Sequence, residues 1–203
     1  VTYFLKSTEV AESNSDIDGA LWECTYSQLS YLYNQQFNYS SALDAAIKGL
    51  DIAEKFNTSN ERTYINTSTA YFESGDTTNA TTLCNKAINN ILGNGISKSN
   101  ADIVSKAMYH YTITNQYLHA GLCYELLKSL PKNELPRNYI PNVAVYLERF
   151  VSADSAAITM SELYATTNSI ESKYDAARWL TRYYVAKGEY EKAADYDIKF
   201  INA

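Results

Sequence analysis

The stretch AKGEYEKAADY, from Ala186 to Tyr196, decides how this chain folds. Gly188 is followed by an acidic residue, and an alanine stands five positions after the glycine. The stretch ESGDTTNATTL, from Glu73 to Leu83, has the same pattern, with Gly75 in place of Gly188. Glycine adopts the left-handed conformation that ends many helices, because it has no Cβ to clash. Each stretch therefore predicts one helix that ends at the glycine and a second helix that begins directly after it.

The same pattern recurs along most of the chain. Tyrosine stands nine positions before the alanine in four repeats, well above the rate expected from 19 tyrosines in 203 residues. The four pairs are Tyr33 and Ala42, Tyr71 and Ala80, Tyr111 and Ala120, and Tyr184 and Ala193. A weaker repeat has Leu147 and Ala156, so the alanines recur at intervals of 38, 40, 36 and 37 residues. A constant interval of this length is typical of an array of stacked supersecondary units.

Within each repeat, apolar and small residues recur at steps of three and four, which places them on one face of a helix. Each repeat is therefore predicted to be two amphipathic helices joined by a tight turn, with small residues on the second helix that allow close approach. The chain is predicted to be all-α and a single domain over 1–203. The predicted repeats lie near 20–57, 58–96, 97–133, 134–170 and 171–203, after an N-terminal helix at 1–16. Two turns lack glycine, at Gln36-Phe37 and at Asn115-Gln116.

Composition excludes several function classes. The net charge is -6 and the basic residues form no cluster, so we expect no direct contact with nucleic acid. No apolar run approaches the roughly 18 residues of a membrane span, so we expect no membrane insertion. Three dispersed cysteines and two histidines with no metal-binding spacing predict neither a zinc site nor a disulfide framework. Phosphate-binding and nucleophile motifs are also absent. The expectation is a protein that is not an enzyme and that has no catalytic residue, cofactor or metal.

The pattern resembles the tetratricopeptide repeat (TPR) family. WLTRYYVAKGEYEKAADY is the best match, followed by LSYLYNQQFNYSSA. The matching positions are Leu180, Tyr184, Gly188, Tyr190 and Ala193 in the first stretch, and Leu29, Tyr33, Tyr39 and Ala42 in the second. The resemblance implies an α-α superhelix, a right-handed solenoid of about five TPR-like helix-turn-helix repeats. Two departures are the absence of the close-packing glycine from the first helices and Asp197, which stands where a large apolar residue is usual.

The resemblance also implies a binding surface, because the first helices of TPR proteins line a concave groove. Aromatic, amide and arginine side chains on that face suit an interface. The candidate partner-binding residues are Tyr31, Asn34, Asn66, Phe72, Tyr109, Arg149, Arg178 and Arg182, and Arg62 maps to the same face. Arg178 and Arg182 are one helical turn apart and have the spacing to hold a carboxylate. The alternative is that they are a solvated pair with acidic neighbours.

Two functions stay open at this point. The first is a non-catalytic module that binds a protein or peptide partner through the concave face. The second is a ligand-sensing domain of a larger bacterial signalling protein, either a sensor kinase or a transcriptional regulator, because TPR-like arrays occur in both. The sequence has no initiator methionine, and we expect it to be a fragment of a longer protein. A periplasmic and a cytoplasmic location, and an oligomer, all stay open.

Overall fold

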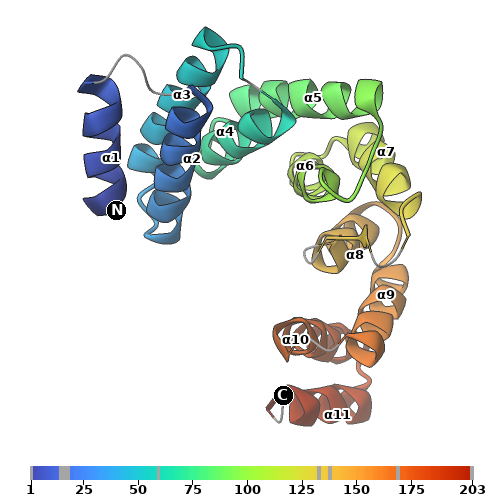
Figure 1. Cartoon of the computed structure of the whole chain (residues 1–203). Coiled ribbons are helices and arrows are strands. Elements are labelled where there is room, and N and C mark those ends of the chain that lie inside the picture. Colours follow the sequence, from blue (N-terminus) through green and yellow to red (C-terminus); the bar gives the residue numbers. More distant parts are fainter. Residues whose placement is uncertain are drawn as a thin grey trace. The chain divides into compact units, whose positions relative to one another are not determined.

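The computed structural model describes residues 2–13, 19–58, 60–131, 134–136, 139–167 and 170–201. Across these residues the chain forms eleven helices and no strand (Figure 1), which confirms the all-α prediction. The helices are α1 (Thr2–Ser13), α2 (Gly19–Gln35), α3 (Tyr39–Lys55), α4 (Glu61–Glu73), α5 (Thr77–Asn94), α6 (Ala101–Ile113), α7 (Tyr117–Lys128), α8 (Tyr139–Phe150), α9 (Ala153–Thr166), α10 (Ile170–Lys187) and α11 (Tyr190–Ile201). Helix α1 falls within the predicted N-terminal helix, and residues 1 and 14–16 of that prediction lie outside the described residues.

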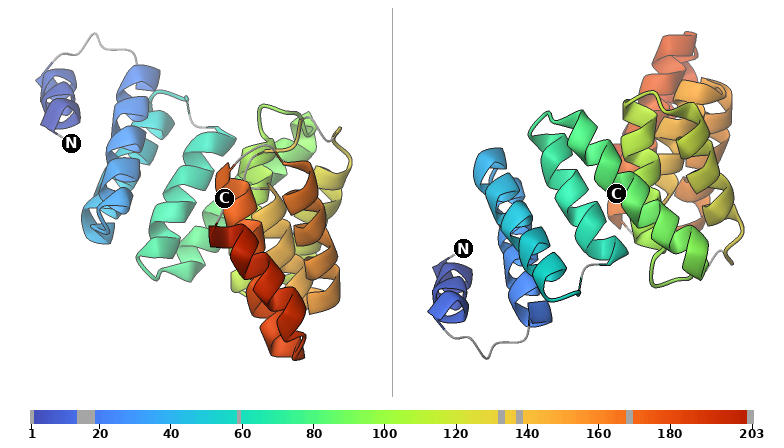
Figure 2. Two further views of the ribbon diagram at one scale, coloured as in Figure 1. Left: turned by 90° about the horizontal axis from the view of Figure 1, so that it is seen from below. Right: turned by 90° about the horizontal axis from the view of Figure 1, so that it is seen from above.

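The described helices belong to two compact units, 1–103 and 104–203, called here the N-terminal unit and the C-terminal unit. In the N-terminal unit, α2 pairs with α3 and α4 pairs with α5, and α1 packs against α2 (Figure 2). In the C-terminal unit, α8 pairs with α9 and α10 pairs with α11, and α10 also packs against α9. A single domain over 1–203 stays a prediction.

One hydrogen-bond pattern explains why tyrosine and alanine recur nine residues apart. In all five repeats, the residue just before the second helix donates its N–H to the carbonyl of the tyrosine or leucine, and its carbonyl accepts from the N–H of the alanine. The tyrosine or leucine contacts are Asn38 to Tyr33 (2.9 Å), Asp76 to Tyr71 (2.9 Å), Gln116 to Tyr111 (2.8 Å), Ser152 to Leu147 (2.8 Å) and Glu189 to Tyr184 (2.9 Å). The linking residue therefore ties the end of one helix to the start of the next.

In four repeats, the residue directly before the linking residue has a left-handed backbone conformation. Gly75 has φ 90° and Gly188 has φ 75°, which confirms the helix ends predicted at both glycines. Phe37 (φ 57°) and Asn115 (φ 61°) adopt the same conformation in the two turns without glycine. Asparagine tolerates positive φ better than a bulky residue does, so Phe37 is the more strained of these two positions.

Small residues bring the paired helices close together. Ala42, Ala46 and Gly49 are buried on α3, and a Cβ at Gly49 would lie 3.2 Å from the Cβ of Tyr26 on α2. On α4, Ser68 stands where TPR repeats carry a glycine, and its hydroxyl donates to the carbonyl of Ala80 at 2.7 Å. That bond satisfies the buried hydroxyl, so the serine is accommodated at a close contact between helices.

In two places, successive repeats meet through the residue four positions after the alanine. In the N-terminal unit, the Thr67 hydroxyl of α4 donates to the carbonyl of Ala46. In the C-terminal unit, the ring of Tyr124 on α7 stacks on Tyr146 of α8, with centroids 5.0 Å apart. The equivalent residue of α11 is Asp197, which is exposed. An aspartate is compatible with that position because no described helix covers it.

We expect Gly49→Leu to lower the free energy of unfolding by about 1 to 3 kcal/mol, because the larger side chain must displace the backbone of α2. Urea unfolding followed by circular dichroism measures this change. Gly93→Leu is the matched control, since a Cβ at Gly93 meets nothing within 4 Å. Equal midpoints for the two variants would show that α2 and α3 do not approach each other at Gly49.

Candidate functional site

The first helices of the C-terminal repeats are held side by side by polar contacts. The Asn142 side-chain amide on α8 donates to the Ser105 carbonyl (3.1 Å) and hydroxyl (3.0 Å) on α6. The Trp179 indole N–H on α10 donates to the Glu148 carboxylate on α8 at 3.3 Å. Residues 104–113 of α6, together with α8 and α10, are called here the first-helix face of the C-terminal unit.

Helix α10 places two arginines on this face without partners. The side chains of Arg178 and Arg182 are exposed, and neither makes a hydrogen bond or an ion pair with any residue in the part of the chain that the structure describes. Arginine carries its charge at every physiological pH and binds carboxylates through two parallel hydrogen bonds. Two such groups one turn apart are therefore available to an anionic group from outside the chain.

One carboxylate of α9, that of Asp154, is engaged by two side chains of α10. The Asp154 carboxylate accepts from the Tyr183 hydroxyl at 2.6 Å and from the Lys187 ammonium at 2.7 Å. The hydrogen bond from Lys187 lowers the pKa of Asp154. The hydrogen bond that Tyr183 donates to Asp154 raises the pKa of Tyr183. The Tyr183 ring also stacks on Trp179, with centroids 5.5 Å apart and an interplanar angle of 14°. Trp179 directly follows Arg178 in the sequence, and Tyr183 directly follows Arg182.

The other two predicted residues of the C-terminal unit lie on the same face. Arg149 on α8 is exposed, and its Nε donates to the Asn115 side-chain oxygen at 2.8 Å. That bond fixes the arginine against the turn between α6 and α7. Tyr109 on α6 is half-buried, and its ring lies 6.2 Å from the ring of His110. The structure thus brings Tyr109, Arg149, Arg178 and Arg182 onto one unit.

The remaining four predicted residues belong to the N-terminal unit, on α2 and α4, which contact each other. Tyr31 is 58% exposed, whereas Asn66 and Phe72 are half-buried. The side-chain oxygen of Asn34 is buried and has no hydrogen-bond partner among the described residues. A buried acceptor without a hydrogen bond raises the free energy of the folded state, so a donor to Asn34 would be stabilising. The eight candidates therefore form two groups of four.

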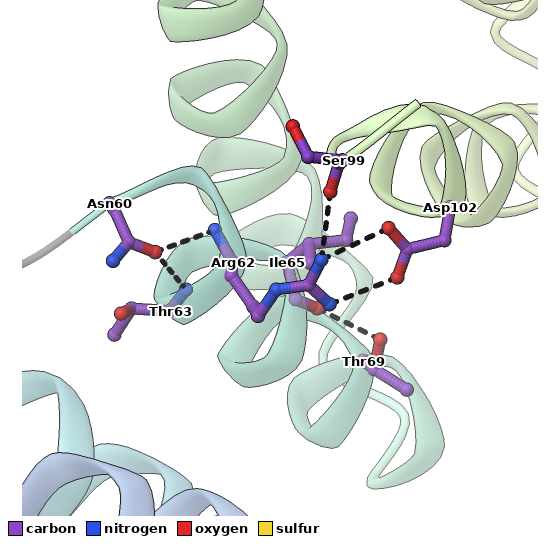
Figure 3. Close-up of polar contacts among 7 residues, drawn as sticks. All are labelled: Asn60, Arg62, Thr63, Ile65, Thr69, Ser99 and Asp102. Carbon is purple, nitrogen blue, oxygen red and sulfur yellow. Dashed lines mark hydrogen bonds and ion pairs between the residues drawn. The ribbon is translucent and has the colours of Figure 1, made fainter. Parts of the chain in front are cut away.

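Arg62 maps to the same face in the sequence, but its side chain is engaged within the N-terminal unit (Figure 3). Its guanidinium makes two hydrogen bonds to the Asp102 carboxylate, at 3.0 and 3.1 Å, and a third to the Ser99 carbonyl at 3.1 Å. The bond to Asp102 raises the pKa of Arg62. Arg62 therefore joins the start of α4 to residues 99–102, a contact that helix periodicity alone does not reveal.

No metal centre is formed by the described residues, since they hold no group of three or more His, Cys, Asp or Glu side chains that suits an ion. Cys84 and Cys123 are buried, and burial raises the pKa of the Cys84 thiol to about 11, which keeps it protonated and unreactive. His110 is buried, and burial lowers its pKa to about 4. Among the helices described, none is long and apolar enough to cross a membrane.

No protein-family model matches the sequence, and no curated protein matches it. Solved structures do match. A putative kinesin light chain of Podosopora anserina with nearly identical TPR-like repeats is 16% identical, with a TM-score of 0.70 over 91% of this chain and 95% of that one. The chain has a TPR-like repeat fold.

Two further solved structures share the TPR-like fold. BtubC from P. vanneervenii is 15% identical, with a TM-score of 0.73 over 99% of this chain and 87% of that one. A signal transduction ATPase with numerous domains from Pyrococcus horikoshii, which carries a tetratricopeptide repeat sensor, is 16% identical. Its TM-score is 0.52, over 95% of this chain and 28% of that one. At these identities the likeness concerns the fold, and TPR-like folds are commonly protein-interaction scaffolds.

Proposed function

We propose that this TPR-like chain is a non-catalytic module that binds a protein or peptide partner through the surfaces formed by the first helices of its repeats. The observation that carries the proposal is the exposed pair Arg178 and Arg182, which has no partner in the described residues and lies beside the Trp179–Tyr183 stack. Arginine and aromatic residues contribute most of the binding energy in many interfaces. The partner that fits the C-terminal unit is an acidic peptide segment.

Each predicted residue has a stated role in this proposal. Arg178 and Arg182 bind a carboxylate of the partner, Arg149 supplies a further positive charge, and Tyr109 provides a rigid ring for apolar contact. In the N-terminal unit, Tyr31 and Phe72 offer aromatic surface and Asn34 and Asn66 offer amide groups. These side chains lie on helices, so little ordering of the backbone is needed when a partner binds.

The test is a selection from a library of random peptides displayed on phage. The selected peptides should be rich in aspartate and glutamate. Arg178→Ala with Arg182→Ala should weaken their binding about 10- to 100-fold, since hot-spot truncations cost about 1.4 to 2.8 kcal/mol in this range. Isothermal titration calorimetry measures the dissociation constant of each peptide.

The matched control is Lys6→Ala with Lys98→Ala, which removes the same charge from exposed sites in the N-terminal unit. This control should keep the affinity of the wild-type protein at moderate salt, because salt screens exposed charges that do not contact the peptide. Equal weakening by both double variants would mean that only net charge matters, and the proposed site would be rejected.

The sensor alternative rests on one observation, the likeness to the protein from Pyrococcus horikoshii whose repeats form a sensor. In this second proposal, a ligand changes the arrangement of the repeats and so biases an attached effector domain. The sequence of the full-length polypeptide tests it. A kinase or DNA-binding domain in the same chain is the expected result, and a full-length chain without an effector domain would reject it.

A further inference from the structure

A second surface feature lies at one end of the helices of the C-terminal unit. A cavity of about 1070 Å³ opens where α7 and α9 end and where α8 and α10 begin. Pockets that bind small molecules typically measure about 300 to 1,000 Å³. Arg178 and Arg182 do not line this cavity. It is therefore a separate candidate site from the arginine pair.

The lining of the cavity is mixed, with apolar and tyrosine side chains beside hydroxyl and charged side chains. Val143 and Leu163 are buried beneath it, on α8 and α9. The Tyr139 ring lies at its edge, and burial raises the pKa of Tyr139 to about 12, so the hydroxyl stays neutral at physiological pH. A ligand in this cavity must therefore carry an apolar part large enough to cover Val143 and Leu163.

The charges in the cavity favour a cation. Three charged residues line it, namely Lys128, Glu162 and Asp175. The Lys128 ammonium is already paired with the Glu125 carboxylate at 3.3 Å and lies over the Tyr124 ring at 5.0 Å. Glu162 and Asp175 make no side-chain hydrogen bond or ion pair with any other described residue. Two exposed carboxylates that line the cavity, one on α9 and one on α10, are therefore unpaired among the described residues.

We propose that this cavity binds an organic cation, with an ammonium or guanidinium group on an apolar stem. The charged group lies against Glu162 and Asp175, and the stem covers Val143 and Leu163. The Tyr139 ring, whose face is attractive to cations, borders the site. This chemistry is supplied either by a free amine or by an arginine or lysine side chain of a peptide.

Two probes test the proposal and distinguish these sources. The first is phenethylammonium chloride, with 2-phenylethanol as a neutral molecule of similar size. The second is the peptide acetyl-Leu-Arg-Leu-amide. Each is titrated to about 10 mM, which detects millimolar dissociation constants, into isotopically labelled protein followed by amide chemical shifts. The ammonium probe should cause saturable shifts of the amide signals of Thr159, Thr166 and Ser172. The neutral probe, 2-phenylethanol, should bind at least several-fold more weakly. Tighter binding of the peptide than of the amine assigns the site to peptides.

Charge and shape variants complete the test. Glu162→Gln with Asp175→Asn should weaken binding about tenfold, since both charged contacts of the cation are lost. Glu191→Gln removes a charge from exposed α11 and should leave binding unchanged. Thr166→Trp adds bulk from an exposed position on the cavity wall and should abolish binding.

Three results would overturn the proposal. They are no saturable shift with either cationic probe, equal affinity for the neutral probe, or unchanged affinity in the Glu162→Gln, Asp175→Asn variant. Circular dichroism spectra equal to that of the wild type show that the variants are folded. The arginine pair on α10 is not altered in any of these variants, so failure here leaves the proposed peptide-binding function standing.

Discussion

Replacing Leu180 by alanine is expected to lower the free energy of unfolding of the C-terminal unit by about 3 to 4 kcal/mol. Leu180 is 0% exposed on α10, which packs against both α9 and α11. Truncation leaves a cavity that the surrounding side chains fill only in part. The size of this effect would show how strongly the last three helices depend on their shared core.

The two tryptophans allow this change to be measured in one unit. Trp22 belongs to the N-terminal unit and Trp179 to the C-terminal unit. In a Trp22→Phe background, tryptophan fluorescence during urea unfolding reports on α10 alone. Val185→Ala is the matched control, because Val185 is 50% exposed on the same helix and should change the free energy by less than about 0.5 kcal/mol. Similar losses in the two variants would contradict the packing described for α10.

Acidification is expected to destabilise the protein through His110. Its pKa is about 4 in the folded protein, first because of burial and second because of the nearby positive charge of Lys106. The unfolded chain takes up the proton near pH 6.5. The folded state therefore binds fewer protons between these values, and stability falls as pH decreases from about 6.5 to about 4. The total loss is about 3 kcal/mol, from a difference of roughly 2.5 pH units at 1.36 kcal/mol each.

Urea unfolding at several pH values between 7.5 and 4 measures this loss. His110→Gln removes the titrating group, so the variant should lose about 3 kcal/mol less than the wild type over the same range. The imidazole signals of His110 should also stay constant in proton NMR spectra from pH 7 to pH 5. Equal pH dependence of wild type and variant would show that His110 is solvated and not buried.

Much of the fold could be predicted from the sequence because the signals are local. Gly75 and Gly188 mark helix ends through backbone conformation alone, and both have positive φ in the structure. The spacing between tyrosine and alanine reflects a hydrogen-bonded link within one repeat, such as that of Asp76 between Tyr71 and Ala80. The left-handed conformation of Phe37 could not be predicted, since a bulky side chain gives no local signal for it.

The candidate surface was less predictable because it depends on contacts between repeats. The helical register placed Arg149, Arg178 and Arg182 on first helices, but only the structure shows that Arg149 is bound to Asn115 while the other two have no partner among the described residues. Arg62 looked equivalent in sequence and is paired with Asp102, 40 residues away. The cavity beside Tyr139 is also formed by residues from four helices, so no single stretch of sequence predicts it.

Site-specific photo-crosslinking tests the central functional claim most directly. A benzophenone amino acid is placed either at Tyr109, on the first-helix face of the C-terminal unit, or at Leu118, which is 78% exposed on the second helix α7. Each protein is irradiated with a selected acidic peptide. The account predicts a strong crosslink from position 109 that disappears in the Arg178→Ala, Arg182→Ala variant, and little or none from position 118. Equal crosslinking from both positions, or crosslinking from position 118 alone, would contradict it.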